Sequence, residues 1–304
     1  NSSNNTVYAD AEGNIAYFHG NFVPKRDVAF DFSQPVDGSN PATDWQGLHN
    51  VEENILLLNP ENGWLQNCNS TPYTAALQYS PKPEDYPVYM SKGQENFRGV
   101  HAISLLSEIN KIDLDGLITL AHDPFLPAFE ALIPGLVKAF DQWGSSVGEM
   151  NAAIEILRQW DFKTSEDSVA MTLAHFYGTR YGQKGVRPFA MSDMELMTYF
   201  GSGSPEKERL AIFEETLQQL NTDFGTWNTP WGSVNRYQRL NGDPRQAFND
   251  SLPSTPIGFA SGQSGTKTGA DIECFEPSMN FIIEPSRGVS KSEQFRECYS
   301  IEEH

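Results

Sequence analysis

One stretch of the chain combines amide side chains with a preceding apolar run, a pattern suited to acyl-transfer chemistry. The run Ile55 to Leu58 and the segment Trp64 to Asn67 flank a turn at residues 59–63, and Asn69 follows two residues later. An asparagine fixed at the end of a rigid element can aim its side-chain N–H at an oxygen on which negative charge develops. In the alternative interpretation, the side chain forms an Asx turn that only ends the strand. The spacing leaves both interpretations open.

Carboxyl groups and tryptophans suggest a second chemistry. Glycoside hydrolysis needs two carboxyl groups placed on either side of a sugar bond, and tryptophan rings can serve as sugar platforms. The chain has 40 Asp and Glu residues and 6 tryptophans. So many acids guarantee chance pairs, and sequence spacing cannot show that two of them converge. An acidic glycan-active hydrolase is therefore the weaker hypothesis.

Several other function classes lose support from the sequence. The patterns GxGxxG, GxxxxGK[ST], HExxH, GxSxG and CxxC do not occur, and the six histidines are scattered singly. Nucleotide binding and zinc hydrolysis are therefore disfavoured. The balance of 21 Lys and Arg against 40 Asp and Glu gives a net charge of -19, which repels nucleic acids and anionic lipids. The longest apolar runs fall far short of the roughly 20 residues that a membrane helix needs.

The elements that would position the amide stretch are strands. Alternating apolar residues predict a hairpin from Val7 to His19, with its turn at residues 12–14. Prolines and glycines break residues 20–50 into irregular chain. The apolar run 55–58 and the segment 64–67 predict a second pair of strands, and the continuous run implies burial on both faces.

The period changes to that of helices between residues 93 and 224. Five amphipathic stripes predict helices near residues 97–109, 125–140, 152–160, 169–177 and 210–220. Short strand candidates follow at Ile257–Ala260 and Met279–Glu284. Strands, then helices, then strands predict an α+β fold. We expect a single domain over residues 1–304, strand-rich at 1–92, helical at 93–224 and rich in strands and loops at 225–304.

A set of motifs occurs in a characteristic order along the chain. It comprises Tyr8 to Tyr17, Val23 to Asp27, Asp44 to Gly47, Asn59-Pro60, Gly63 to Asn69, Arg98, Leu120 to Asp123, Trp160-Asp161, Asp167-Ser168 and, more loosely, Trp231-Gly232. This ordered set resembles the penicillin acylase family, which includes penicillin amidases and acyl-homoserine lactone acylases. The family belongs to the N-terminal nucleophile hydrolases.

The resemblance implies an αββα sandwich, here incomplete and with a helical insertion, that hydrolyses an acyl amide through a serine acyl-enzyme. In the family, the serine begins the β subunit, and its own α-amino group is the base. This chain is similar to part of that subunit only, and the resemblance places the serine before the segment matched by Tyr8 to Tyr17. Ser2 and Ser3 do not replace it. We therefore expect this chain alone to be inactive.

The resemblance also assigns two site residues. Asn69 matches the family's oxyanion donor, and Arg98 matches an arginine that supports the active site. On the predicted helix, Arg98 borders the apolar face, so its guanidinium should be partly desolvated and have an acidic or amide partner. The alternative is an ordinary surface charge that flanks the helix.

The remaining expectations concern cofactors, partners and location. No cofactor is implied; a calcium site known in some family members cannot be assigned to residues here. The implied partners are a small N-acyl substrate and the remaining segments of the acylase. An uncovered sheet edge would also favour self-association.

A periplasmic or secreted location and a role in antibiotic metabolism are implied by resemblance alone. The chain has three cysteines, Cys68, Cys274 and Cys298, which are enough for one disulfide, and the sequence leaves its formation undecided. A non-catalytic binding or scaffold domain on the same fold is the alternative function.

Overall fold

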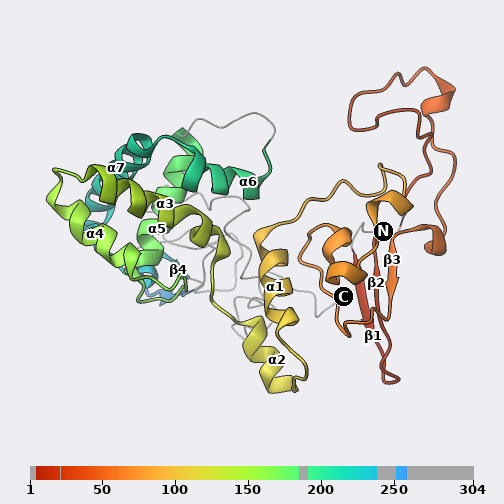
Figure 1. The fold of residues 1–304 in the computed structure, drawn as a ribbon, viewed down its shortest axis with the longest axis horizontal. Helices are drawn as coiled ribbons and strands as arrows, with labels where there is room; N and C mark the ends of the chain where they lie inside the picture. The colour runs from red at the N-terminus through yellow and green to blue at the C-terminus, as the bar shows by residue number, and fades with distance from the viewer. Residues whose placement is uncertain (1–4, 21, 185–190, 238–250, 259–304) are drawn as a thin grey trace. The chain divides into compact units, whose positions relative to one another are not determined.

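A computed structural model describes residues 5–20, 22–184, 191–237 and 251–258. The chain divides into two compact units, residues 1–111 and 112–304 (Figure 1). The first unit holds the strands β1 to β3, and the second holds the helices α2 to α8. This mixture of helices and small sheets is α+β, as predicted. None of the helices among the described residues is both long enough and apolar enough to cross a membrane.

The first unit is built on a three-stranded antiparallel sheet with the order β1-β2-β3. Its strands are β1 (Thr6–Ala9), β2 (Ile15–Phe18) and β3 (Leu56–Leu58). β1 and β2 form the predicted hairpin. Asp10 closes the turn, because one carboxylate oxygen accepts the backbone N–H groups of Glu12 and Asn14, each at 2.9 Å. Gly13 has a φ of 88° in this turn, a conformation that favours glycine.

The prediction that residues 55–58 and 64–67 form a second pair of strands is wrong. β3 pairs with β2, with Leu57 opposite Tyr17, and the segment 64–67 is extended chain outside any strand. Burial on both faces is also wrong, because Leu58 is 60% exposed while Ile55 is fully buried. β3 belongs to an antiparallel sheet, and such a sheet can leave one face open to solvent, whereas a strand buried on both faces is typical of parallel sheets.

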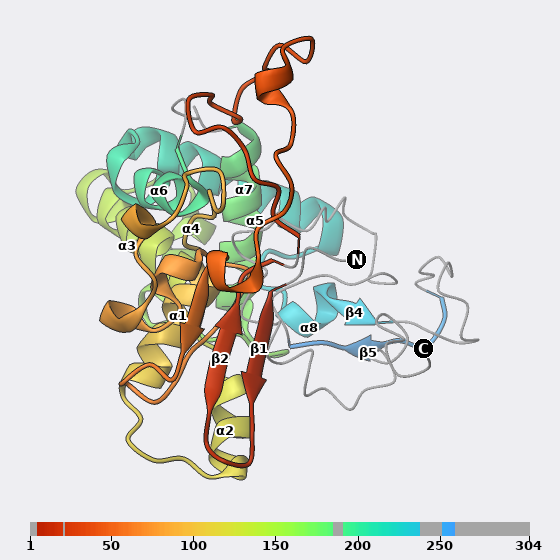
Figure 2. The same ribbon diagram turned by 90° about the vertical axis from the view of Figure 1, so that its right-hand side faces the viewer.

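The chain between β2 and β3 makes a long excursion that extends beyond the sheet (Figures 1 and 2). As predicted, this part is irregular. Its described residues include two short 3-10 helices, η1 (Pro41–Thr43) and η2 (Val51–Glu53). Pro24 and Leu48 pair across the base of the excursion in an isolated antiparallel bridge. The excursion therefore leaves and rejoins the sheet at neighbouring points.

Three short 3-10 helices connect the amide stretch to the first long helix. They are η3 (Pro72–Thr74), η4 (Leu77–Tyr79) and η5 (Pro83–Asp85), and α1 (Phe97–Ser107) follows. α1 begins where the sequence predicts a helix. Its predicted broad buried face is narrower in the structure, because only Phe97 and Gly99 of this helix are buried.

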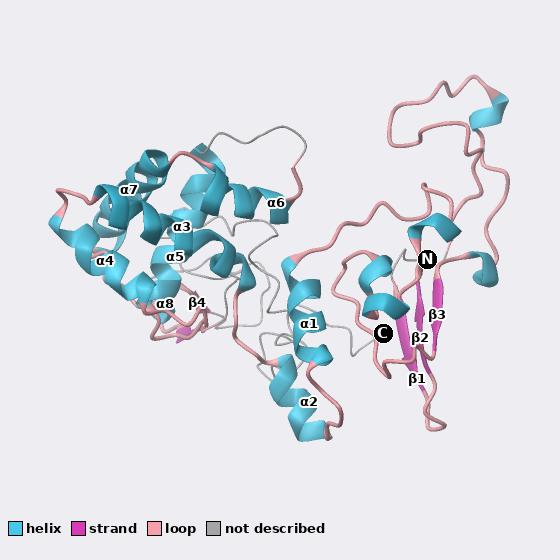
Figure 3. Cartoon of the chain, viewed as in Figure 1, coloured by secondary structure: helices cyan, strands magenta, loops and turns pink. Residues whose placement is uncertain are grey.

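The described part of the second unit is mostly helical (Figure 3). Four predicted helices are confirmed as α3 (Pro127–Trp143), α4 (Gly148–Arg158), α5 (Val169–Lys184) and α7 (Glu206–Phe224). The elements without a prediction are α2 (Leu114–Ala121), α6 (Asp193–Thr198), a π-helical turn η6 (Tyr199–Gly203), α8 (Trp231–Val234) and a small sheet of β4 (Arg236–Tyr237) and β5 (Thr255–Pro256). Of the predicted strand Ile257–Ala260, residues 257–258 follow β5 and belong to no strand, and residues 259–260 lie outside the described residues, as does all of Met279–Glu284.

Close backbone contact fixes the packing of α3 against η6. A Cβ on Gly135 would lie 1.4 Å from the carbonyl oxygen of Gly201, so no larger residue fits there without moving the backbone. Arg209, only 3% exposed, ties the two elements together. Its guanidinium donates to the carbonyl oxygens of Phe200 at 3.0 Å and Ser204 at 2.6 Å, and to that of Gly135 in α3 at 3.3 Å. A buried cation with carbonyl partners of this kind makes the packing specific.

Candidate active site

The amide stretch lies in the first unit, held by hydrogen bonds to two neighbouring segments. The backbone N–H of Gln66 donates to the carbonyl oxygen of Ala75 at 2.9 Å. The backbone N–H of Thr71 donates to the carbonyl oxygen of Gln94 at 3.1 Å. These bonds replace the strand pairing that the sequence predicts. The stretch is therefore fixed at both ends, although it belongs to no sheet.

Asn96 links this stretch to the start of α1. Its side-chain oxygen accepts the backbone N–H of Gly99 at 2.9 Å, which makes it the N-cap of α1. Its side-chain amide donates to the carbonyl oxygen of Cys68 at 3.1 Å. One side chain thus fixes both the first turn of the helix and the peptide that precedes Asn69. Sequence reasoning missed Asn96, although an asparagine just before an apolar helical stripe is a recognised helix-start signal.

Asn69 and Arg98, the two residues assigned by resemblance, are in direct contact. The Arg98 Nη2 donates to Asn69 Oδ1 at 3.1 Å. The expectation of an acidic or amide partner for Arg98 is confirmed. Arginine carries only donors, so the carbonyl oxygen of the Asn69 amide must face the guanidinium. The amide nitrogen of Asn69 must then point the other way, where it can donate to a further group.

The backbone of Asn69 is left-handed, with a φ of 57°. Asparagine is among the few residues that adopt this conformation at low cost. The side chain of Asn69 is exposed and that of Arg98 is half-buried. The first unit therefore presents an oriented amide donor at its surface. Both original interpretations, a donor and a turn, fit this backbone, and experiments that separate them are given below.

The side chain of Asn67 has a different hydrogen-bond partner from that of Asn69. Its side-chain oxygen accepts a hydrogen bond from the Asn5 amide at 3.3 Å. It therefore ties the stretch to the chain that leads into β1. The two asparagines are only two residues apart, yet their amides have separate partners, which makes Asn67 a matched control for Asn69.

The glycan-active hypothesis gains no support from the described residues. A general acid for that reaction needs a raised pKa. Each described carboxyl group whose pKa departs from its ordinary value has a lowered one; the largest causes are hydrogen bonds, for example from Asn14 to Asp10 and from Arg158 to Asp141. Of the tryptophans that suggested sugar platforms, Trp45, Trp64, Trp227 and Trp231, Trp231 is fully buried in a core, whereas Trp45 is 64% exposed, with the Arg26 guanidinium 5.7 Å from its ring centroid. Within the described ranges, no group of three or more metal-ligating side chains is present.

The comparisons with known proteins identify the family of this α+β chain. It belongs to the penicillin amidase family, whose family model matches residues 1–290. A segment of 68 residues is 40% identical to penicillin G acylase of Escherichia coli, and this segment is 22% of the chain and 8% of that protein.

A solved structure supports the fold. The chain is similar to a thermostable penicillin G acylase from Alcaligenes faecalis, with a TM-score of 0.53 and 15% sequence identity. The match covers 91% of this chain and 54% of the Alcaligenes chain. At this identity the likeness shows the fold alone. The chain thus spans about half the length of this relative.

The link made by Asn96 leads to a local prediction. Asn96→Ala removes both the cap and the bond to Cys68, and loss of a cap alone typically costs about 1 kcal/mol. Asn96→Ser keeps a capping oxygen, but its shorter side chain lacks the amide group that reaches the carbonyl oxygen of Cys68. Hydrogen exchange should therefore quicken in α1 and in residues 68–71 for Asn96→Ala, and only in residues 68–71 for Asn96→Ser.

A second helix supplies the control. Asp113 caps α2 through the backbone N–H of Gly116 at 2.8 Å, and that is its only side-chain bond among the described residues. Asp113→Ala should quicken exchange in α2 alone. If residues 68–71 stayed fully protected from hydrogen exchange in Asn96→Ser, the bond to Cys68 would not stabilise this stretch.

Proposed function

We propose that this chain is part of an acylase that cleaves an acyl amide through a serine acyl-enzyme, and that it supplies the oxyanion donor and part of the acyl-pocket wall. The contact between Arg98 and Asn69 carries the proposal, because it leaves the amide nitrogen of Asn69 as an oriented donor. Membership of the penicillin amidase family supports the amide-hydrolase class. The nucleophile and the rest of the pocket would come from other parts of the complete enzyme.

The proposed chemistry proceeds in two steps. The serine oxygen attacks the amide carbonyl carbon, and its proton passes to the base, the α-amino group of the serine. The carbonyl oxygen becomes an oxyanion, which Asn69 Nδ2 stabilises by hydrogen bonding. The amine leaves with the proton, and an ester remains on the serine. Water then attacks the ester in the same way and releases the carboxylic acid.

Arg98 has a positioning role in this scheme. Its guanidinium fixes which end of the Asn69 amide faces outward, and its positive charge polarises the amide so that the N–H becomes a better donor. The N-cap Asn96 holds both partners in register, since it fixes the start of α1 and the peptide before Asn69. The donor would thus be preorganised before substrate binds.

The sheet supports the proposed αββα sandwich. β1 lies at one edge, and all four of its residues are exposed, with Val7 at 57% and Tyr8 at 49%. An open edge with apolar side chains tends to pair with another strand. We propose that strands from the remaining segments of the acylase extend the sheet here. Self-association through the same edge is the alternative when those strands are absent.

The exposure of Asn69 favours one competing function, a non-catalytic binding or scaffold domain on the same fold. The two functions differ in what Arg98 does. In an acylase, Arg98→Met should lower kcat by about 10- to 100-fold with little change in KM, because a hydrogen bond to a charged group is worth about 1.5 to 3 kcal/mol. The measurement is steady-state hydrolysis of a chromogenic phenylacetyl amide by the complete enzyme.

Arg26→Met is the matched control for Arg98→Met. The guanidinium of Arg26 lies over the Phe32 ring at 4.6 Å and makes no contact with Asn69 among the described residues. Its replacement also removes one positive charge from the first unit, but kcat should change less than 3-fold. Equal losses in the two variants would show that Arg98 acts only through general charge, and the positioning role would be wrong.

A further inference from the structure

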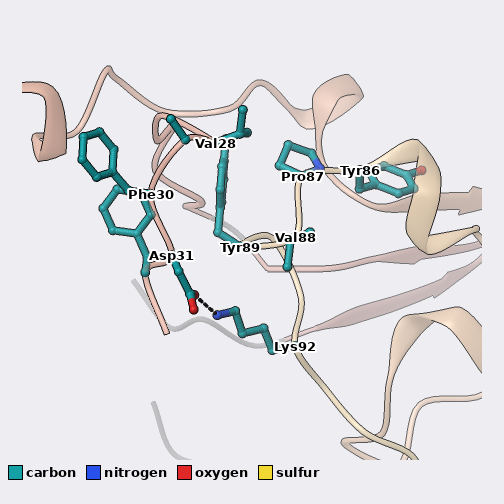
Figure 4. A pocket seen from close by; sticks show the side chains of 10 residues that line it. Val28, Phe30, Asp31, Tyr86, Pro87, Val88, Tyr89 and Lys92 are labelled. Atoms are coloured by element: carbon teal, nitrogen blue, oxygen red, sulfur yellow. Dashed lines mark hydrogen bonds and ion pairs between the residues drawn. The ribbon is translucent and has the colours of Figure 1, made fainter. Parts of the chain in front are cut away.

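A pocket of about 440 Å³ lies in the first unit, between the excursion and the chain that precedes α1 (Figure 4). Residues 28–32 form one side, and residues 86–89 with Lys92 form the other. Its volume falls in the range of about 300 to 1,000 Å³ that is usual for small-molecule sites. None of its lining residues belongs to the Asn69–Arg98 site.

Aromatic side chains form the walls, and their neighbours hold them in place. Phe30 and Phe32 lie with ring centroids 6.2 Å apart, and the guanidinium of Arg26 lies 4.6 Å from the centroid of Phe32. On the other side, the hydroxyl of Tyr89 is hydrogen-bonded to His49 Nε2 at 3.0 Å. With its polar end already bonded, Tyr89 offers the pocket mainly its ring. Such walls suit a flat or ring-sized apolar group.

The charged side chains of the pocket are Asp31 and Lys92, which face each other in Figure 4. Asp31 Oδ1 accepts the backbone N–H of Ser33 at 2.9 Å and its hydroxyl at 2.6 Å. The distance from Lys92 Nζ to the same oxygen is longer, 3.4 Å. The charge of Asp31 is therefore already solvated by Ser33, and this exposed ion pair is weak.

Lys92 has the unused bonding capacity. An ammonium group has three N–H donors, and Asp31 is the one partner of Lys92 among the described residues. A group that accepts hydrogen bonds and carries negative charge would satisfy the other donors. Arg26, behind the Phe32 ring, adds a second positive charge to this side of the pocket. The local charge therefore favours an anion, even though the whole chain has a net charge of -19.

We propose that this pocket binds a small molecule with a ring-sized apolar body and one carboxylate. The body lies against Phe30, Phe32 and Tyr89, and the carboxylate accepts hydrogen bonds from Lys92. Binding here requires neither the serine nor Asn69, so this proposal does not depend on the acylase function. A carboxylic acid released by amide hydrolysis would belong to the same chemical class.

The test uses 2-naphthoate, a fluorescent aromatic carboxylate, and fluorescence anisotropy with the full chain. We expect saturable binding that is weakened at least 10-fold by Lys92→Gln. Lys82→Gln removes an exposed lysine that does not line the pocket, and it should leave the affinity unchanged. The neutral 2-naphthamide should bind at least 10-fold more weakly than the acid.

A second variant tests the location independently of charge. Ala29 is exposed and lines the pocket, so Ala29→Trp fills the space without removing a buried side chain. It should abolish binding of 2-naphthoate. The proposal is overturned if 2-naphthoate does not bind, if neither variant changes its affinity, or if 2-naphthylmethylamine binds more tightly. The last outcome would assign the pocket to cations held by Asp31 and the rings.

Discussion

Asn69→Ala is expected to lower the kcat of the complete enzyme by about 10²- to 10³-fold, the usual cost of losing one oxyanion donor. Negative charge develops on the carbonyl oxygen only as the serine attacks, so the Asn69 amide stabilises the transition state far more than the bound substrate. KM should therefore change little. The measurement is steady-state kinetics on a chromogenic amide, with correct processing checked by mass spectrometry.

Three further variants separate the donor from the turn. Asn69→Gly keeps the left-handed backbone, which glycine adopts readily, but removes the donor, so it should be as inactive as Asn69→Ala. Asn69→Asp keeps a partner for Arg98 but replaces the donor with negative charge, so it should also be inactive. Asn67→Ala loses only the 3.3 Å bond from Asn5 and should stay within about 10-fold of the parent enzyme. Near-normal kcat in Asn69→Gly would establish the turn as the role of Asn69.

The second large effect is acid destabilisation of the second unit through His175. This residue is 2% exposed on α5, and its ring lies 4.8 Å from that of Trp231. Burial lowers the pKa of His175 from 6.5 to about 4. Above pH 6.5 the ring is neutral in both the folded and the unfolded chain, so its protonation does not lower the free energy of unfolding. Between pH 6.5 and 4 only the unfolded chain binds the proton, so the unfolding free energy should fall by about 3 kcal/mol.

His175→Leu should remove this pH dependence. Leucine has a similar volume, and neither ring nitrogen of His175 has a hydrogen-bond partner among the described residues, so little is lost at pH 7. Urea unfolding at pH 7 and pH 5, followed by the fluorescence of the tryptophans, should show about 2 kcal/mol of this fall in the parent, because that interval crosses about 1.5 pH units below 6.5. His122→Gln, in the loop after α2, is the control and should retain the parent's acid sensitivity. An equal fall in stability in His175→Leu would assign the acid sensitivity to other groups.

Local patterns predicted much of the fold. The hairpin of β1 and β2 depends on alternation and on a Gly13 turn, and α3, α5 and α7 depend on apolar residues at helical spacing, all of which are readable along the chain. The prediction of a strand at Trp64–Asn67 is wrong for a non-local reason. β2 pairs with β3 on the edge that β1 leaves free, and one hydrogen bond from Gln66 to the carbonyl oxygen of Ala75 takes the place of a ladder. The spacing of apolar residues within a segment does not determine which other segment it pairs with in a sheet.

The missed elements η6 and α2 have two different causes. η6 exists where Gly201 meets α3 at Gly135, a contact between residues far apart in sequence. α2 has only eight residues and buries none of them, so its short stripe of Leu114, Leu117 and Ile118 carried little signal. The candidate site was predicted residue by residue at Asn69 and Arg98, but through family resemblance. Their direct contact and the role of Asn96 needed the structure.

The most direct test of the central claim is a crystal structure of the complete enzyme with a boronic acid bound to the nucleophilic serine. A boronate adduct is tetrahedral and anionic, and one of its oxygens occupies the position of the oxyanion, so it mimics the intermediate. The account predicts Asn69 Nδ2 at about 2.7–3.1 Å from that oxygen, with Asn69 Oδ1 still accepting from Arg98. A boronate oxygen bound by other donors, with the Asn69 amide turned away from it, would contradict the assignment.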